Sequence, residues 1–287
     1  MRNSSAAPIR LLALDLDDTL LRDDLTISPR DKEAVLAAEH AGVRIVLASG
    51  RVRESMQPYA DALGMRDRPG YIVSGNGTLV TRSDTAEVVL RHLLATETAL
   101  TAYRLVDRHG LPAEVYIGDT AYASRDDRWV DEDCECSGLS KCIVPQFEKL
   151  IAGIDVPKIM IPGDPEKLSR LQAVLQAEFD GSIHTVTSKP YFLEILPSAA
   201  DKGSAVAHIA TELGIPRAQV MAIGDGMNDA GMIRYAAIGV AMPNASEELK
   251  AIADWVAPAD NEHAGVAQAL ELVLGASPAP DPSAARQ

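Results

Sequence analysis

The stretch Arg10–Leu21, which reads RLLALDLDDTLL, constrains the fold of this chain more than any other segment. Its apolar run Leu11–Leu14 has the length and composition of a buried strand. That run changes abruptly into three carboxylates and a hydroxyl, supplied by Asp15, Asp17, Asp18 and Thr19. Carboxylates at the end of a buried strand repel one another, so stability alone does not account for them. The pattern predicts a hard cation such as Mg²⁺ among them, with an ordinary polar turn as the alternative.

Strands and helices alternate on both sides of the middle of the chain. Ser28-Pro29 is a helix start signal, and Gly42 is the matching stop signal. A second buried strand is predicted over 43–48, followed by a helix over about 52–63. The alternation resumes from Asp201. This order predicts an α/β fold with a Rossmann-like parallel sheet.

The pattern changes between these two regions. Strands bounded by turns, with two helices among them, predict a small α+β module inserted at 84–190. The parallel-sheet core is then expected to comprise 9–83 and 191–274. The ends of the chain, 1–8 and 275–287, are predicted to be flexible, the latter because it is rich in Pro, Ala and Ser.

Composition excludes several classes of partner. The net charge is −14 and no basic patch is evident, which argues against nucleic acid but leaves room for a small phosphorylated ligand. No stretch approaches the roughly 20 apolar residues of a membrane span. The N-terminus has no apolar signal core, so a cytoplasmic location is expected.

The inserted module contains a helix predicted over 165–179 and a polar segment that carries all three cysteines: Cys134, Cys136 and Cys142. A soft-metal site is one interpretation, but no histidine lies nearby and a fourth ligand is missing. Reduced structural thiols are the favoured interpretation.

Polar clusters follow the predicted parallel strands at 15–19, 49–51 and 224–229, and Lys202 opens a helix after a loop. Ligands of open α/β sheets bind beyond the carboxyl ends of the strands, so these clusters are expected to meet in one crevice. Two sets of carboxylates, a hydroxyl with exposed N–H groups and an ammonium are what phosphoryl transfer requires. Taken singly, each cluster is also compatible with a plain turn, a helix cap or a solvated lysine.

Together the motifs DLDDTLL (Asp15–Leu21), SGR (Ser49–Arg51), DKGSAV (Asp201–Val206) and GDGMND (Gly224–Asp229) resemble those of a known family. The chain is similar to the haloacid dehalogenase-like phosphatases, and among them to the Cof-type sugar phosphatases with a type IIB cap. The resemblance covers about 9–274. It implies that the inserted module is a cap that closes over the crevice, excludes water and sets specificity.

The resemblance also implies roles for the reacting groups. Asp15 is expected to attack phosphorus, and Asp17 to act as general acid and then general base. Thr19 is expected to orient Asp17. Ser49 and the Gly50 N–H are expected to hold phosphate oxygens.

The resemblance further implies which groups neutralise the charge of the phosphate. Lys202 is expected to offset the phosphate charge and to restrain Asp15. The expected Mg²⁺ ligands are the carboxylates of Asp15 and Asp225 and the Asp17 carbonyl. Asp229 is expected to contact these ligands rather than the metal itself.

Three further side chains are substrate-binding candidates: Asn228, Arg51 and Asn244. Two positions depart from the family pattern. Asp18 stands where many members have Gly, and Pro243 replaces a usual Gly beside Asn244.

The predicted function is Mg²⁺-dependent hydrolysis of a small phosphorylated metabolite such as a sugar phosphate, by a monomer or homodimer. A sugar phosphomutase of the same superfamily and a non-catalytic metabolite-binding protein are the alternatives. Release of inorganic phosphate without a bisphosphate activator separates hydrolysis from mutase chemistry. A non-catalytic protein need not keep every reacting group, so the last alternative is disfavoured by the presence of all five: Asp15, Asp17, Lys202, Asp225 and Asp229.

Overall fold

The computed structural model describes residues 8–275, which divide into two compact units. The predicted flexible termini, 1–8 and 275–287, lie outside the described residues except for Pro8 and Gly275. Among the described residues, the first unit comprises 8–48, 59–71 and 206–275, and the second comprises 49–58 and 72–205.

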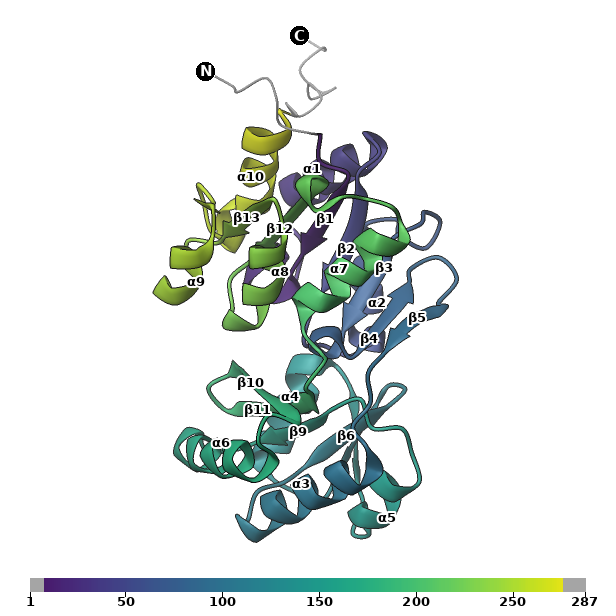
Figure 1. The fold of residues 1–287 in the computed structure, drawn as a ribbon, viewed down its shortest axis with the longest axis vertical. Helices are drawn as coiled ribbons and strands as arrows, with labels where there is room; N and C mark the ends of the chain where they lie inside the picture. The colour runs from purple at the N-terminus through teal and green to yellow at the C-terminus, as the bar shows by residue number, and fades with distance from the viewer. Residues whose placement is uncertain (1–7, 276–287) are drawn as a thin grey trace. The chain divides into compact units, whose positions relative to one another are not determined.

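A parallel sheet forms the centre of the first unit (Figure 1). Its strands lie in the order β14-β13-β12-β1-β2, and each neighbouring pair is parallel. All residues of β1 are buried, as its continuous apolar run predicts. The strands are β1 Leu11–Leu14, β2 Arg44–Ala48, β12 Val220–Gly224, β13 Ile238–Ala241 and β14 Trp255–Val256.

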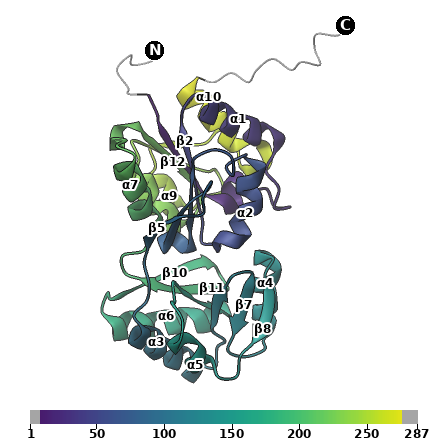
Figure 2. The ribbon, with the colours of Figure 1, turned by 90° about the vertical axis from the view of Figure 1, so that its right-hand side faces the viewer.

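Helices α1 and α10 pack side by side in this unit, as both ribbon views show (Figures 1 and 2). The predicted start of α1 is confirmed, because the Ser28 hydroxyl accepts a hydrogen bond from Asp31 N–H and Pro29 occupies the first turn. Asp31 is buried and also accepts a hydrogen bond of 2.7 Å from Ala267 N–H on α10. The helices of this unit are α1 Pro29–His40, α8 Ala230–Tyr235, α9 Glu247–Ile252 and α10 Gly265–Leu274.

Three elements continue from one unit into the other along the chain: α2 Arg53–Ala62, β3 Tyr71–Ser74 and α7 Lys202–Glu212. After β3, Gly75–Gly77 forms a 3₁₀ turn in which Asn76 has a φ of 54°. It leads to the antiparallel pair β4 Leu79–Arg82 and β5 Val88–Arg91.

The second unit contains a six-stranded sheet in the order β10-β11-β9-β6-β7-β8. All pairs are antiparallel except β7 with β8. Because β11 pairs with both β9 and β10, this sheet continues beyond residue 190, the predicted end of the inserted module. The strands are β6 Glu114–Ile117, β7 Thr120–Ala123, β8 Ser140–Ile143, β9 Ile159–Pro162, β10 Ile183–Lys189 and β11 Phe192–Pro197.

One face of this sheet is apolar and packs against α3 Thr96–Arg108, α5 Phe147–Ala152 and α6 Pro165–Phe179. The bounds of α6 match the predicted helix, and Asp164 caps it by accepting hydrogen bonds from the N–H groups of Glu166 and Lys167. Helix α4 Arg128–Ser137 lies in the cysteine-bearing segment, for which no helix is predicted. Within residues 8–275 no helix is both long and apolar enough to cross a bilayer.

Candidate active site

The turn after β1 carries the first set of candidate residues. Asp15 leaves the strand with its N–H bonded to the carbonyl of Ile223 in β12, at 3.0 Å. The chain then forms a single π turn, Leu16–Leu20, in which Asp17 is extended and Asp18 has a φ of 57°. Aspartate tolerates this left-handed conformation better than most residues, which explains why it can stand at a position where Gly is common in the family.

The loop after β12 is shaped around the carboxylate of Asp229. This buried group accepts hydrogen bonds of 3.0 Å from the N–H groups of Asp225 and Gly226. A Cβ atom at Gly224 would lie 2.5 Å from the Asp229 carboxyl carbon, and one at Gly226 would lie 2.3 Å from Asn228 Oδ1. Both glycines therefore leave room for the side chains that order the loop.

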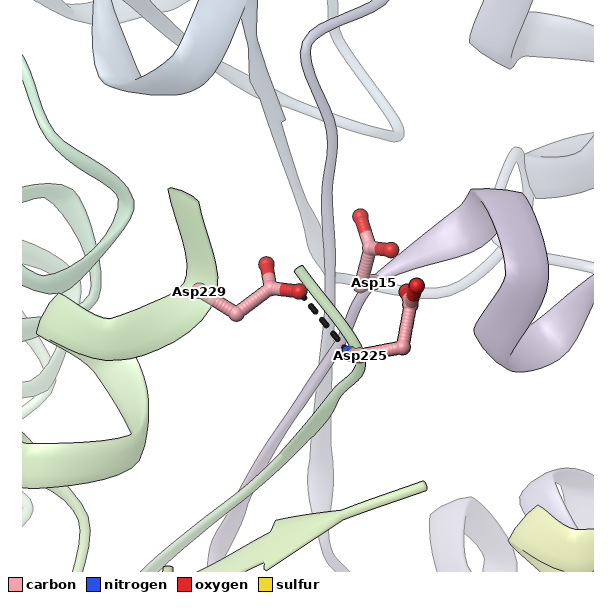
Figure 3. A group of neighbouring side chains, drawn as sticks. All are labelled: Asp15, Asp225 and Asp229. Carbon is pink, nitrogen blue, oxygen red and sulfur yellow. Dashed lines mark hydrogen bonds between the residues drawn. The ribbon is translucent and has the colours of Figure 1, made fainter. Parts of the chain in front are cut away.

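Asp15, Asp225 and Asp229 each offer a carboxylate oxygen, and these oxygens lie within 4.8 Å of one another (Figure 3). Asp15 and Asp229 are buried and Asp225 is half-buried. Three carboxylates this close are the donor set and spacing that a small oxygen-seeking dication prefers. The cluster therefore fits the Mg²⁺ predicted at this position, and Asp229, which supports the loop, also offers an oxygen there.

Burial raises the pKa of the Asp225 carboxyl to about 7, and the charges of Asp229 and Asp18 act in the same direction. Hydrogen bonds from Thr19 and with Asp15 oppose that rise in pKa. Like charges in a low-dielectric site favour the protonated form of one member. A bound dication removes this penalty, so the raised pKa is a further sign that the cluster accommodates positive charge.

Two hydrogen bonds join the acidic turn to more distant parts of the same unit. The Thr19 hydroxyl donates to Asp225 Oδ1 at 2.9 Å, whereas the family resemblance implies that Thr19 orients Asp17. Asn244 Nδ2 donates to the carbonyl of Asp18 at 2.8 Å. Asn244, a substrate-binding candidate, thus holds the turn through its backbone. Asn228 is half-buried in the loop after β12.

The remaining candidates belong to the second unit. Ser49 is buried, and its Oγ accepts a hydrogen bond of 3.1 Å from Arg51 N–H. The Arg51 guanidinium donates to the carbonyl of Cys136 in the last turn of α4, at 3.2 Å. Lys202 is completely buried at the start of α7. A buried ammonium is retained only near compensating oxygens or negative charges, which favours a functional lysine over a solvated one.

A buried polar network in the second unit is absent from the sequence-based predictions. Lys158 forms an ion pair of 3.1 Å with Glu194, which also accepts a hydrogen bond from Asn76. A lone carboxylate inside the apolar run FLEILP, and a lysine directly before IMIP, are the sequence signals that could have revealed it.

The three cysteines are free thiols, as expected. Burial raises the pKa of the Cys134 thiol to about 12, with the charges of Glu114 and Asp133 adding to the rise. The protonated form is therefore favoured, which is typical of a structural thiol.

A family model described as haloacid dehalogenase-like hydrolase matches residues 12–270. The chain belongs to this family. YxeH of Bacillus subtilis (strain 168) is 36% identical over 269 residues, which cover 92% of this chain and 98% of that protein. The HMP-PP phosphatase of Serratia proteamaculans (strain 568) is 29% identical and is covered to 87% of its length by 85% of this chain.

Solved structures of haloacid dehalogenase-like hydrolases share the fold. The crystal structure of one such hydrolase from Bacteroides thetaiotaomicron has a TM-score of 0.85 and 33% sequence identity. The match covers 92% of this chain and 99% of the chain in that structure. The subclass IIB sugar phosphatase BT4131 has a TM-score of 0.78 over 92% of this chain and 98% of its own. Its identity is 21%, so that likeness concerns the fold. The predicted family, the Cof-type branch and the fold class are confirmed.

Proposed function

We propose that this member of the family is a Mg²⁺-dependent phosphatase that hydrolyses a small phosphomonoester through an aspartyl-phosphate. The observation that carries the proposal is the cluster of Asp15, Asp225 and Asp229 beyond the adjacent parallel strands β1 and β12. Ligands of parallel α/β sheets bind at that end of the strands. Relatives named as phosphatases support the reaction class.

Mg²⁺ held by Asp15, Asp225 and the Asp17 carbonyl, with Asp229 beside them, would neutralise charge on the phosphoryl oxygens. The Asp15 carboxylate forms a bond to phosphorus while the bond from phosphorus to the leaving oxygen breaks. The Asp17 carboxyl gives its proton to that oxygen, so a neutral alcohol departs.

The second half of the reaction reverses the role of Asp17. Its carboxylate takes a proton from water as the water oxygen bonds to phosphorus, and the bond to Asp15 breaks. Inorganic phosphate leaves and the Asp15 carboxylate is restored. Ser49 and the Gly50 N–H would donate to phosphoryl oxygens throughout, and the Lys202 ammonium would offset their charge.

This scheme requires Ser49 and Lys202 to act on the same phosphoryl group as Asp15. Chain connectivity supports it, because Ser49 directly follows β2 as Asp15 directly follows its parallel neighbour β1. We propose that the inserted module predicted at 84–190 extends through β11 and serves as the cap. Arg51, Asn228 and Asn244 stay substrate-binding candidates.

The substrate is proposed to be a small phosphorylated metabolite, with sugar phosphates first. Two relatives are named for other small phosphorylated compounds, HMP-PP and 5-amino-6-(5-phospho-D-ribitylamino)uracil, so both types belong in a test panel. A cytoplasmic location and a monomeric or homodimeric state also stay predictions.

The decisive experiment measures phosphate release from this panel with Mg²⁺ and with chelator, for the wild type and for Asp15→Asn. Metal-dependent release that disappears in the variant supports the proposal. Release that requires a bisphosphate activator favours a mutase. Binding of a panel compound without any release favours a metabolite-binding protein.

A further inference from the structure

The six-stranded sheet of the second unit has a polar face opposite its apolar core. The strand register places Glu114, Met160 and Glu194 in one row across β6, β9 and β11. Paired residues of antiparallel strands point to the same face, and Lys158 lies two residues before Met160. Lysine and two glutamates are thereby collected on one buried surface.

Lys158 and Glu194 form an ion pair across this surface. Lys158 Nζ lies 3.1 Å from Glu194 Oε2, and the two side chains are only 6% and 1% exposed. Removing both charges from water is so unfavourable that a well-packed apolar pair of similar volume is often equally stable. Stability alone therefore does not account for the pair at this depth.

Both members of the pair reach the Ser49–Arg51 loop. Lys158 Nζ donates to the carbonyl of Gly50 at 2.9 Å. Glu194 accepts from Asn76 Nδ2 at 3.1 Å, and Asn76 N–H donates to the carbonyl of Ser49 at 2.9 Å. A Cβ atom at Gly50 would lie 3.0 Å from Asn76 Nδ2 and 3.3 Å from Glu194 Oε1, so the loop backbone packs directly on the network.

The contact at Gly50 determines how the Ser49 hydroxyl is held. The Gly50 carbonyl and the Arg51 N–H belong to one planar peptide group, so fixing one end fixes the other. Lys158 holds the carbonyl end, and the N–H end donates to Ser49 Oγ at 3.1 Å. A serine hydroxyl that accepts this bond keeps its own proton for donation.

We propose that Lys158 and Glu194 are positioning residues, which hold the Gly50–Arg51 peptide so that the Ser49 hydroxyl donates to the substrate phosphoryl group. The inference rests on the proposed function, because it assigns Ser49 to phosphate binding. It adds two residues that are distant in the sequence: Lys158 is 108 positions after Gly50, and Glu194 is 145 positions after Ser49. Both act on the phosphate through this loop.

The test uses a variant that separates positioning from stability. Lys158→Met alone leaves Glu194 buried without its cation, so the melting temperature should fall by about 10 °C. The double variant Lys158→Met/Glu194→Leu removes both charges and should recover most of that loss. The matched control, Arg104→Met/Glu148→Leu, removes an exposed ion pair of the same unit, whose side chains are 49% and 47% exposed.

We expect kcat/KM of the stable double variant to fall about 10²-fold, since small misplacement of a binding group has effects of this size. Inorganic phosphate, measured by calorimetry with Mg²⁺ present, should bind about 10-fold more weakly to it. Adding Ser49→Ala to the double variant should lower kcat/KM no further, because all three changes act through one hydroxyl. The exposed-pair control should keep wild-type kcat/KM and phosphate affinity.

A double variant with recovered stability and unchanged phosphate affinity would overturn the positioning role. The role would also be overturned if the loss of kcat/KM in the double variant and the loss in Ser49→Ala added fully when the changes are combined. Either result leaves the proposed function standing if the wild type hydrolyses a phosphomonoester. If the wild type hydrolyses none, the proposed function fails, and phosphate affinity alone decides the inference. Absence of phosphate binding to the wild type overturns it as well.

Discussion

Two buried acidic sites, one in each unit, have their charge balanced in opposite ways. In the first, Asp15, Asp225 and Asp229 gather like charges at the end of a parallel sheet. In the second, Glu194 is balanced by Lys158 at 3.1 Å. A cluster of like charges depends on positive charge brought from elsewhere, whereas an ion pair carries its own. The first arrangement suits reversible binding of a cation, and the second suits permanent positioning of a loop.

The largest expected effect comes from removing the proposed nucleophile in the first unit. Asp15→Asn should lower kcat by at least about 10⁴-fold, because a neutral amide cannot form the aspartyl-phosphate. Single-turnover phosphate release measures the loss. The variant should unfold at the wild-type temperature or above it, since one of three like charges is gone. Release at the wild-type rate would rule out covalent catalysis by Asp15.

Metal removal should affect only the cluster of the first unit. With chelator, phosphate release should stop and return on addition of Mg²⁺. Mg²⁺ at 100 times its Kd should stabilise the wild type by about 2.7 kcal/mol. Asp225→Asn should abolish most of this stabilisation, as measured by thermal melting with and without Mg²⁺. An equal gain in the wild type and the variant would place the metal elsewhere.

The metal-free protein should also show a pH dependence that originates in this cluster. The pKa of Asp225 is about 7 in the folded state, above its usual value of 3.8. The protonated folded form is therefore favoured, so its stabilising contribution is complete at low pH and is lost as the pH rises towards 7. The slope for one group is at most about 1.4 kcal/mol per pH unit. Urea unfolding in chelator from pH 5 to 8 should show it for the wild type but not for Asp225→Asn.

A smaller effect is expected from Glu114 in the second unit. Its carboxyl oxygens are buried and have no hydrogen-bond partner among the described residues. Burial and the charge of Asp133 raise the pKa of Glu114 well above its usual value, although Lys158 opposes this. Glu114→Met should therefore stabilise the fold at pH 8 by about 1–2 kcal/mol and by less at pH 5. Urea unfolding at both pH values measures the difference, and a loss of stability at pH 8 would show that the ionised carboxylate is needed.

Local sequence signals predicted the parts of the molecule that depend on neighbouring residues. The continuous apolar run of β1, the Ser28 cap of α1 and the bounds of α6 all follow from such signals. Helix α4 has similar signals, since Asp127 caps its start and Gly138 ends it with a φ of 70°. Its acidic, cysteine-rich composition obscured them.

The network around Lys158 depends instead on strand register. Lys158 and Glu194 are 36 positions apart and meet only because β9 pairs with β11 in one particular alignment. The partner of Thr19 is a similar case, because Asp225 lies 206 positions away. Long-range pairing of this kind has no local sequence signal, so the candidate acidic residues were predictable and their hydrogen-bond partners were not.

Asp18, which has a left-handed backbone conformation in the turn after β1, affects how the cation site responds to pH. The Asp18 charge raises the pKa of Asp225, so a proton competes with the cation near neutrality. A chain with glycine there loses that charge and keeps the backbone conformation. Asp18 therefore adds to a rise in pKa whose main cause is burial, and an Asp18→Gly variant should bring the pKa of Asp225 down slightly and reduce proton competition at the acidic end.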